Sequence, residues 1–343
     1  MSKSSDRTIV AVAVAIIAVI LLGEVVVYTS DYTDFSADAT YSDGILEYTI
    51  SADGSKVYSV IVNDNGSYKG IDKLIIYYDP SYKANYEDVK VAIGAKELDQ
   101  EYYVEQLTPT LRYRNVHDIS IVDADGLREA MESDIRDETL RYGIVVISGA
   151  LPETVYTGNG SDLVFSWMNS GGSLYWLGNL IGSCYATQDE LVYVQDYQEL
   201  FFGSECLNTD GPKKAYEEID GYCKAMSMVN TDLKYAVNGS LLPTDTKHVD
   251  IGFTDSGFST ASLIGYGSGM ICIISGDYSN NQRNDLAQII ASGIGPESEI
   301  VAIEEGTVTR GSISGTIGCS GENLSAFIYL GGYYPVYCKL FRL

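Results

Sequence analysis

One cysteine and two histidines could together form a nucleophile and its base. Cys184 follows a glycine-rich apolar segment, and the two histidines of the chain are His117 and His248. A thiol becomes a strong nucleophile when a neighbouring imidazole removes its proton, so a Cys184–histidine pair would predict a hydrolase. Alternatively, since His117 precedes a predicted strand and His248 begins one, both make only local hydrogen bonds.

Asp277 is a second residue that could do chemistry. It ends a predicted strand that runs directly into a helix, and Ser279 follows two residues later. A carboxylate beside a helix N-terminus can bind a polar ligand, or it can cap the helix. Capping is the commoner role of aspartate at this position, and ligand binding stays open as the alternative.

Three predicted strand ends could gather such residues at one place. In an open α/β sheet, ligands bind outside the carboxyl ends of the strands. The segments that lead to these ends cover residues 143–152, 171–178 and 273–280. The candidate ligand-binding residues at these ends are Ser148, Gly149, Gly178, Asp277 and Ser279.

At these strand ends the chain resembles the class I glutamine amidotransferase-like superfamily. In that family one strand ends in Ser-Gly-Gly and supplies oxyanion-hole amides. A second strand ends in the nucleophile elbow Cys-Leu-Gly, and a late strand carries a histidine followed by a glutamate. Here Ser148-Gly149 matches the first motif and Leu177-Gly178 matches the end of the elbow. The resemblance covers residues 74–293.

The same resemblance implies that the amidase chemistry is lost. Trp176 stands where the family has its nucleophilic cysteine, and the late strand ends in Gly276-Asp277 without a histidine. An indole can act neither as the nucleophile nor as its base. We therefore interpret Trp176 as a degenerate nucleophile position whose large side chain fills the former pocket.

The elements that must position these residues alternate between strands and helices. Over residues 73–295, short apolar runs are separated by helical patterns. This alternation predicts an α/β fold: an open, mostly parallel, flavodoxin-like or amidotransferase-like sheet with helices on both faces. A β-hairpin that turns at Asp53-Gly54 is predicted within residues 29–72, and glycine-rich strands predict a C-terminal β appendage over residues 296–343.

The N-terminus contains an apolar run. Residues 8–28 offer about 20 membrane-compatible residues, the length of a transmembrane helix. Lys3 and Arg7 precede the run, so residues 1–7 should be cytoplasmic and the C-terminal domain should lie outside. A cleaved signal peptide is the alternative, although its apolar part is usually shorter. The sequence therefore predicts a single-pass membrane protein that is anchored by this helix.

Composition limits the partners and cofactors. The formal net charge is -25 and the isoelectric point is near 4.2, whereas binding to nucleic acid needs clusters of Lys and Arg. Nucleic acid is therefore excluded as a partner. The six cysteines show no CxxC pair and no zinc spacing, so no metal site is expected. The glycines of residues 265–269 fit a hairpin better than a dinucleotide loop, and no cofactor is expected.

These observations lead to one main hypothesis and two alternatives. The main hypothesis is a membrane-anchored extracytoplasmic protein whose amidotransferase-like domain binds or scaffolds a cell-surface protein or polymer without catalysis. The first alternative is an extracytoplasmic hydrolase with a rearranged site that uses Cys184 or Asp277. The second is a purely structural role at the cell surface, since a fold by itself does not determine a function.

Overall fold

The computed structural model describes most of the chain beyond its N-terminus. The described residues are 35–85, 100–114, 116–137, 141–208, 222, 235–253, 259–274, 280–321, 323–331 and 337–343. The predicted membrane span at 8–28, Asp277 and Ser279 lie outside these ranges. The chain divides into two compact units: unit 1 is Met1–Tyr58 with Glu305–Gly318, and unit 2 is Ser59–Glu304 with Cys319–Leu343.

Unit 1 is built from long antiparallel strands. It contains β1 (Phe35–Ser42) and the larger parts of β2 (Ile45–Asp64) and β15 (Glu299–Gly318). β1 pairs with β2 through a two-residue turn at Asp43-Gly44, where both residues have positive φ. Asp-Gly is favoured in such a turn because aspartate tolerates and glycine readily adopts this backbone conformation.

The predicted hairpin at Asp53-Gly54 is therefore wrong. These residues lie inside β2, which continues without interruption from Ile45 to Asp64. Residues 29–72 contain two Asp-Gly pairs, and of these only Asp43-Gly44 adopts the left-handed backbone that a hairpin turn needs. β1 pairs with β2 up to Ala52 and β15 also pairs with β2, so the second Asp-Gly pair lies within a continuous paired strand.

Two tyrosines of β2 cover glycines of β15. A Cβ atom added at Gly315 would meet the Tyr48 ring, and one added at Gly306 would meet the Tyr58 ring. The two tyrosine rings also contact each other, with centroids 6.2 Å apart. Glycine is therefore needed in β15 because each position lies against an aromatic ring, an arrangement that pins the register of long strands.

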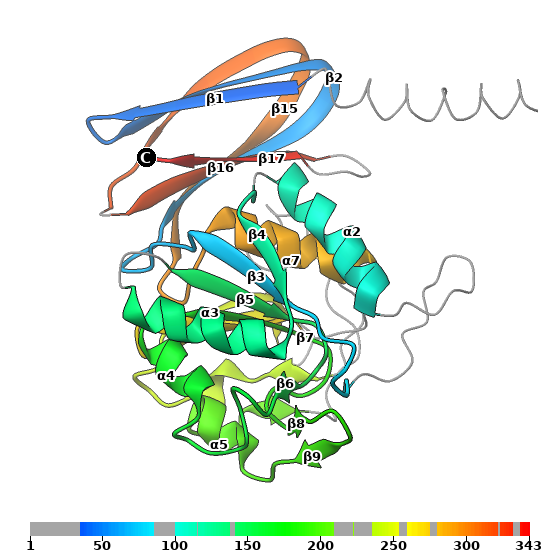
Figure 1. Ribbon diagram of the computed structural model, residues 1–343. Helices are drawn as coiled ribbons and strands as arrows, with labels where there is room; N and C mark the ends of the chain where they lie inside the picture. The colour runs from blue at the N-terminus through cyan, green and yellow to red at the C-terminus, as the bar shows by residue number, and fades with distance from the viewer. Residues whose placement is uncertain are drawn as a thin grey trace, which may run out of the picture. The chain divides into compact units, whose positions relative to one another are not determined.

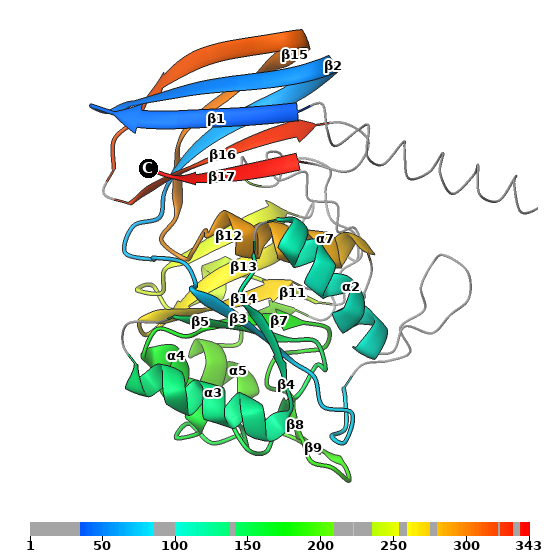
Figure 2. The same ribbon diagram turned by 45° about the horizontal axis from the view of Figure 1, so that its top comes forward.

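A nine-stranded mixed sheet organises unit 2. Five strands are parallel in the order β4-β3-β5-β7-β14, and β13, β12, β11 and β10 extend the sheet with antiparallel pairing. Their bounds are β3 Lys73–Tyr77, β4 Ile119–Val122, β5 Tyr142–Val146, β7 Ser173–Leu177, β10 Leu207–Asn208, β11 Ala236–Val237, β12 His248–Phe253, β13 Ser259–Tyr266 and β14 Gly269–Ile274. Figure 2 shows β12, β13 and β14 side by side.

Helices cover both faces of this sheet (Figure 1). Apolar side chains of α2 (Gln100–Tyr113) and α7 (Asn280–Ser292) form one buried cluster with alternate strand residues such as Leu74 and Ile76. The opposite cluster contains Ile75 and the intervening strand residues, packed on α3 (Ala124–Arg136), α4 (Leu163–Asn169) and α5 (Tyr197–Phe202). Because side chains alternate between the faces of a strand, each strand supplies both clusters.

The remaining described elements are short or lie at the C-terminus. A three-stranded sheet is formed by β6 (Leu151–Pro152), β8 (Cys184–Ala186) and β9 (Leu191–Tyr193). A 3-10 turn covers Gly239–Leu241. The last two strands, β16 (Leu324–Gly331) and β17 (Tyr337–Arg342), pair with each other in antiparallel fashion.

The predicted fold, an open, mostly parallel sheet with a C-terminal β appendage, is contradicted by the mixed pairing of the strands. Four of the nine strands join the main sheet in antiparallel fashion. β12, β13 and β14 follow one another in the sequence with connections too short for the crossover helix that parallel neighbours need. The strands after Pro296 are part of a second, five-stranded sheet with β1 and β2, whose order is β1-β2-β16-β17 with β15 paired to β2. The predicted hairpin at residues 265–269 is confirmed, since Tyr266 pairs with Gly269.

The prediction of a single-pass membrane protein is also contradicted. Among the residues that the structure describes, no helix is long and apolar enough to cross a membrane. The apolar run at residues 8–28 on which that prediction depended is not among them. An apolar run of sufficient length is compatible with a transmembrane helix, but none of the described helices has that length and hydropathy.

Two isoleucines that are register partners on adjacent strands test the burial of the core on one face of the sheet. Ile76 of β3 is fully buried, whereas its register partner Ile121 of β4 is 52% exposed. We expect Ile76→Ala to lower the free energy of unfolding by about 2–5 kcal/mol, because it removes buried methyl groups and leaves a cavity. The matched change Ile121→Ala should cost less than about 1 kcal/mol. Urea unfolding of both variants measures this, and equal losses would contradict the difference in burial between Ile76 and Ile121.

Candidate functional site

The carboxyl ends of the parallel strands form the first candidate site, which we call the carboxyl edge. The loops that follow β3, β5 and β7 bring Asn85, Gly149 and Asn179 together there. Cys184 belongs to the same edge because the Asn85 side chain hydrogen bonds to its sulfur. The structure thus brings Ser148, Gly149, Gly178 and Cys184 to the edge where the sequence analysis places a ligand.

The backbone at Ser148 and Gly149 is already occupied by the chain itself. The Ser148 carbonyl accepts a hydrogen bond of 2.7 Å from the Asn85 backbone N–H, and its hydroxyl donates to the Ala150 carbonyl at 2.6 Å. Gly149 has φ +64°, and a Cβ atom there would collide with the Asn85 carbonyl oxygen. The main chain of Asn85 therefore lies against the position where an oxyanion hole would need open space.

Trp176 is a core residue that also fixes the end of β7. Its side chain is fully buried in the cluster on the α3 face, and its indole N–H donates to the Asn179 carbonyl at 2.6 Å. The Asn179 side-chain amide in turn donates to the Asn85 carbonyl at 2.6 Å. A turn through Gly178, with φ +93°, lets the chain make these contacts. The indole and two asparagines thus lock the carboxyl edge in a closed form.

The Cys184 thiol is poorly suited to nucleophilic attack. It is fully buried at the start of β8, and this burial raises its pKa to about 11 despite hydrogen bonds from Ser183 and Asn85. A raised cysteine pKa favours the neutral thiol, which is a weak nucleophile. At neutral pH the group is therefore a small apolar side chain in the core.

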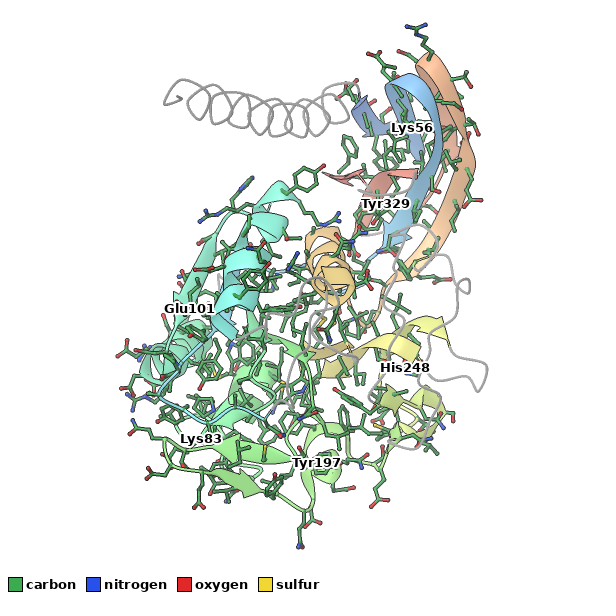
Figure 3. All side chains as sticks on the ribbon, turned by 90° about the vertical axis from the view of Figure 1, so that its right-hand side faces the viewer. Lys56, Lys83, Glu101, Tyr197, His248 and Tyr329 are labelled. Carbon is green, nitrogen blue, oxygen red and sulfur yellow. The ribbon has the colours of Figure 1, made fainter. Side chains whose placement is uncertain are left out.

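Neither histidine lies near Cys184 in the topology of the sheet. His117 is exposed and precedes the amino end of β4. His248 begins β12 and pairs with Ile264, whose own partner in β14 is Ile271, in the amino half of that strand. Figure 3 shows His248 and Lys83, a residue of the loop over the carboxyl edge, on opposite sides of unit 2. A Cys184–histidine pair does not form.

The contacts of His248 are local. Its Nε2 lies 3.6 Å from an Asp250 carboxylate oxygen, and its Nδ1 is 3.4 Å from the Thr246 carbonyl oxygen. Both partners are two residues away along the chain. This arrangement agrees with the interpretation that the histidine makes local hydrogen bonds and gives no evidence for a catalytic role.

The acidic residues of the carboxyl edge cap a helix. Asp123 is the N-cap of α3 and accepts from the Gly126 backbone N–H at 2.8 Å. Asp79 accepts from the Ala124 backbone N–H at 3.1 Å and from Ser81. Partial burial opposes the ionisation of Asp79, but these hydrogen bonds outweigh it and lower the pKa of the carboxyl group. Both carboxylates are thus used to stabilise the start of α3.

The second candidate site is a cavity at the opposite edge, which we call the amino-edge cavity. It has a volume of about 790 Å³ and reaches the starts of β5, β7 and β14 at Arg141, Gly171 and Gly269. Its other charged lining residues are Asp134, Asp245, Lys247 and Glu297. The lining is therefore polar and carries both signs of charge.

Asp134 lies at the end of α3 and is 8% exposed. One of its carboxylate oxygens accepts from the Trp167 indole N–H at 2.7 Å and from the Tyr142 backbone N–H at 3.3 Å. The other oxygen has no hydrogen-bond partner in the described part of the chain. Burial raises the pKa of Asp134 although both hydrogen bonds lower it, so the ionised form lacks part of the compensation that a buried carboxylate needs.

Arg141 and Lys247 supply the positive charge of the cavity. The Lys247 charge acts on Glu297, whose pKa is held below its usual range chiefly by hydrogen bonds from the Ser67 hydroxyl and backbone N–H. The Arg141 side chain makes no ion pair with the residues that the structure describes. Burial raises the pKa of Tyr68, and the Arg141 charge opposes this rise, which places the guanidinium near the phenol.

Four residues of the two sites were not among the residues predicted from the sequence: Asn85, Asn179, Asp134 and Arg141. Asn85 acts mainly through its main chain, for which no residue type gives a signal. Asp134 and Arg141 lie on either side of the segment between α3 and β5, and their types are common on solvated surfaces. Only the apolar run that follows Arg141, which predicts that the chain enters the sheet there, could have drawn attention to that position.

The comparisons with known proteins give no family. No family model matches the chain, and no curated protein matches it. The exo-β-1,4-mannosidase Op5Man5 from Opitutaceae bacterium strain TAV5 is similar with a TM-score of 0.32 and 13% identity, over 66% of this chain and 35% of that one. A cytoplasmic protein from Salmonella typhimurium LT2 gives 0.35 and 13%, over 64% and 95%.

A third solved structure, the β-galactosidase from Bacillus circulans sp. alkalophilus, has a TM-score of 0.35 and 11% identity, over 75% of this chain and 35% of that one. The chain thus spans about a third of the length of the mannosidase and of the galactosidase. Similarities this weak assign neither a fold family nor an activity, so the site has to be interpreted from its own geometry.

Gly149→Ala tests the closure of the carboxyl edge, with Gly293→Ala as its control. Both glycines have a left-handed backbone, at φ +64° and +69°, but only Gly149 has a neighbour in the way of a Cβ atom, whereas Gly293 has open space. The left-handed conformation should cost each variant about 1–2 kcal/mol. The clash with Asn85 should cost Gly149→Ala about 1–3 kcal/mol more, measured by urea unfolding. Equal losses would show that the Asn85 main chain does not close this edge.

The reactivity of Cys184 gives a pH-dependent prediction. With a pKa of about 11 the thiolate is scarce at pH 8, so ionisation alone should slow alkylation roughly 200-fold relative to a free cysteine, and burial should slow it further. Because the pKa is raised, the rate should keep increasing as the pH rises above 8. Iodoacetamide labelling followed by peptide mass spectrometry measures this, with the denatured chain as the reference. Rapid labelling of the native protein at pH 7 would contradict a buried, neutral thiol.

Proposed function

We propose that this protein is a binding module without catalytic activity, built on an α/β core that resembles the glutamine amidotransferases. The observation that carries the proposal is the closed carboxyl edge. The Asn85 main chain lies against Gly149, and Trp176 stands in the core at the matched nucleophile position. A substrate carbonyl would need that space.

The chemistry of the available side chains supports the same conclusion. Acyl transfer through a covalent intermediate requires a nucleophile within hydrogen-bond reach of a base. Cys184 is buried as a neutral thiol, and both histidines lie toward the amino ends of the strands. The described residues therefore offer no nucleophile and base that act together at the carboxyl edge.

The rearranged hydrolase receives no specific support from the described residues. Of its two candidate nucleophiles, Cys184 has the unfavourable environment described above, and Asp277 lies outside the described ranges. Two other carboxylates of the carboxyl edge, Asp79 and Asp123, accept hydrogen bonds at the start of α3. Asp79 accepts three hydrogen bonds, from Ser81 and the Ala124 backbone N–H, which lower its pKa and make it a poor proton acceptor.

A binding role is favoured because unit 2 retains a polar cavity of suitable size. The amino-edge cavity of about 790 Å³ falls within the range of about 300–1,000 Å³ that small-molecule sites occupy. Its lining combines hydroxyl, guanidinium, ammonium and carboxylate groups. Such a set can bind and orient a polar ligand without providing a nucleophile.

An assay of amide and ester hydrolysis tests the proposal. The full chain is incubated with L-glutamine and with a panel of small amides and esters, together with the variants Cys184→Ala and Cys272→Ala. Cys272 is also a fully buried cysteine and belongs to the core on the α2 face, so its change controls for a general loss of packing. We expect no turnover above the rate in buffer for any of the three proteins.

One pattern of results would overturn the proposal. Turnover of any substrate that is abolished by Cys184→Ala and retained by Cys272→Ala would establish Cys184 as a nucleophile. Turnover that neither variant changes would establish an enzyme with a different site. In both cases the protein could no longer be described as a binding module without catalytic activity.

A further inference from the structure

The amino-edge cavity contains two groups of opposite charge that lack an ionic partner. Asp134 and Arg141 both line it, and the Tyr142 backbone N–H, next in sequence to Arg141, hydrogen bonds to the Asp134 carboxylate. The two residues are therefore neighbours at the start of β5. The partner that each group lacks indicates which groups a ligand would have to supply.

Arg141 lacks an anion. Its side chain is half-buried, and within the described ranges it forms no ion pair with a carboxylate. The other cation of the lining, Lys247, is close enough to Glu297 to lower the pKa of that carboxyl group. A guanidinium binds a carboxylate through two parallel N–H donors, so a ligand carboxylate is a suitable partner for Arg141.

Asp134 lacks a hydrogen-bond donor. More than nine-tenths of the residue is buried, and one oxygen already accepts two hydrogen bonds from Trp167 and Tyr142. The second oxygen accepts none from the described residues. An unsatisfied buried carboxylate oxygen is costly. Because this oxygen has almost no exposed surface, the Asp134 side chain must turn toward the cavity before a ligand ammonium group can donate to it, and the ammonium group then supplies both a donor and a compensating charge.

Ligands of a single kind satisfy only half of this site. A simple anion would pair with Arg141 and leave the Asp134 carboxylate without a donor, in a lining that also contains Asp245 and Glu297. A simple amine would leave Arg141 unpaired. A neutral polyol could reach both, but hydrogen bonds between charged groups are about twice as strong as neutral ones.

We propose that the amino-edge cavity binds a small zwitterion of the α-amino-acid class, with the ligand carboxylate on Arg141 and the ligand ammonium group on Asp134. This inference rests on the proposed function and names the class of ligand that the binding module takes. The serine and threonine hydroxyls of the lining, at Ser67, Ser170, Thr246 and Ser268, surround the remainder of the ligand.

Isothermal titration calorimetry of the full chain with the twenty common L-amino acids tests the proposal. Propionate, propylamine and glycerol serve as probes that carry only the anion, only the cation and only hydroxyl groups. We expect at least one amino acid to bind with a Kd below about 1 mM, and each of the three control probes to bind at least tenfold more weakly.

Two conservative variants locate the binding site. Asp134→Asn keeps an oxygen that can accept from Trp167 but removes the charge, and Arg141→Gln removes the guanidinium. Each should weaken amino-acid binding at least tenfold. The exposed residues Asp189 and Arg128 do not line the cavity, so Asp189→Asn and Arg128→Gln are matched controls that should leave the Kd unchanged. Circular dichroism confirms that each variant is folded.

Each other outcome has a definite meaning. Absence of binding across the amino acids overturns the inference, as does binding that Asp134→Asn and Arg141→Gln leave unchanged. Propionate or glycerol that binds as tightly as the best amino acid would establish an anion or polyol site instead. The inference and the proposed function fail separately, because hydrolysis in the turnover assay refutes the function while calorimetry reports the ligand class.

Discussion

Burial on both faces of the parallel strands is the constraint on which the rest of this structure depends. Every residue of β5 and β7 is buried, and their side chains alternate between the two apolar clusters. Polar groups that serve a ligand therefore cannot come from the faces of these strands and must lie at the two edges where the strands begin and end. The function of unit 2 therefore has to be inferred from the polar groups at these two edges.

The two edges have opposite characters. At the carboxyl edge, Asn85 and Asn179 satisfy the exposed main chain with the protein's own groups, and Asp79 and Asp123 serve the start of α3. At the amino edge, by contrast, Asp134 retains an oxygen without a donor beside a sizeable cavity. An edge whose polar groups are already hydrogen bonded gains little free energy from a ligand. An edge with an unpaired polar atom gains the free energy of the hydrogen bond that the ligand supplies.

Some of these features could be predicted from the sequence, because they follow from local rules. The alternation of apolar runs with helical patterns indicated a sheet covered on both faces, and glycines at residues 265–269 indicated the β13–β14 hairpin. The antiparallel strands were missed because short apolar runs such as β12 have the same pattern in either direction. The hairpin at Asp53-Gly54 was wrong because a strand partner, which the local pattern does not reveal, keeps that pair extended.

The sequence by itself determined which reactive side chains the chain contains: two histidines in all and six cysteines without a CxxC pair. Only the tertiary structure decided where the remaining polar groups meet. Asn85 closes the carboxyl edge through its main chain, and Asp134 comes beside Arg141 because α3 returns the chain to the start of β5. Residue type dictates what a side chain can do, whereas proximity and desolvation arise only when distant segments pack together.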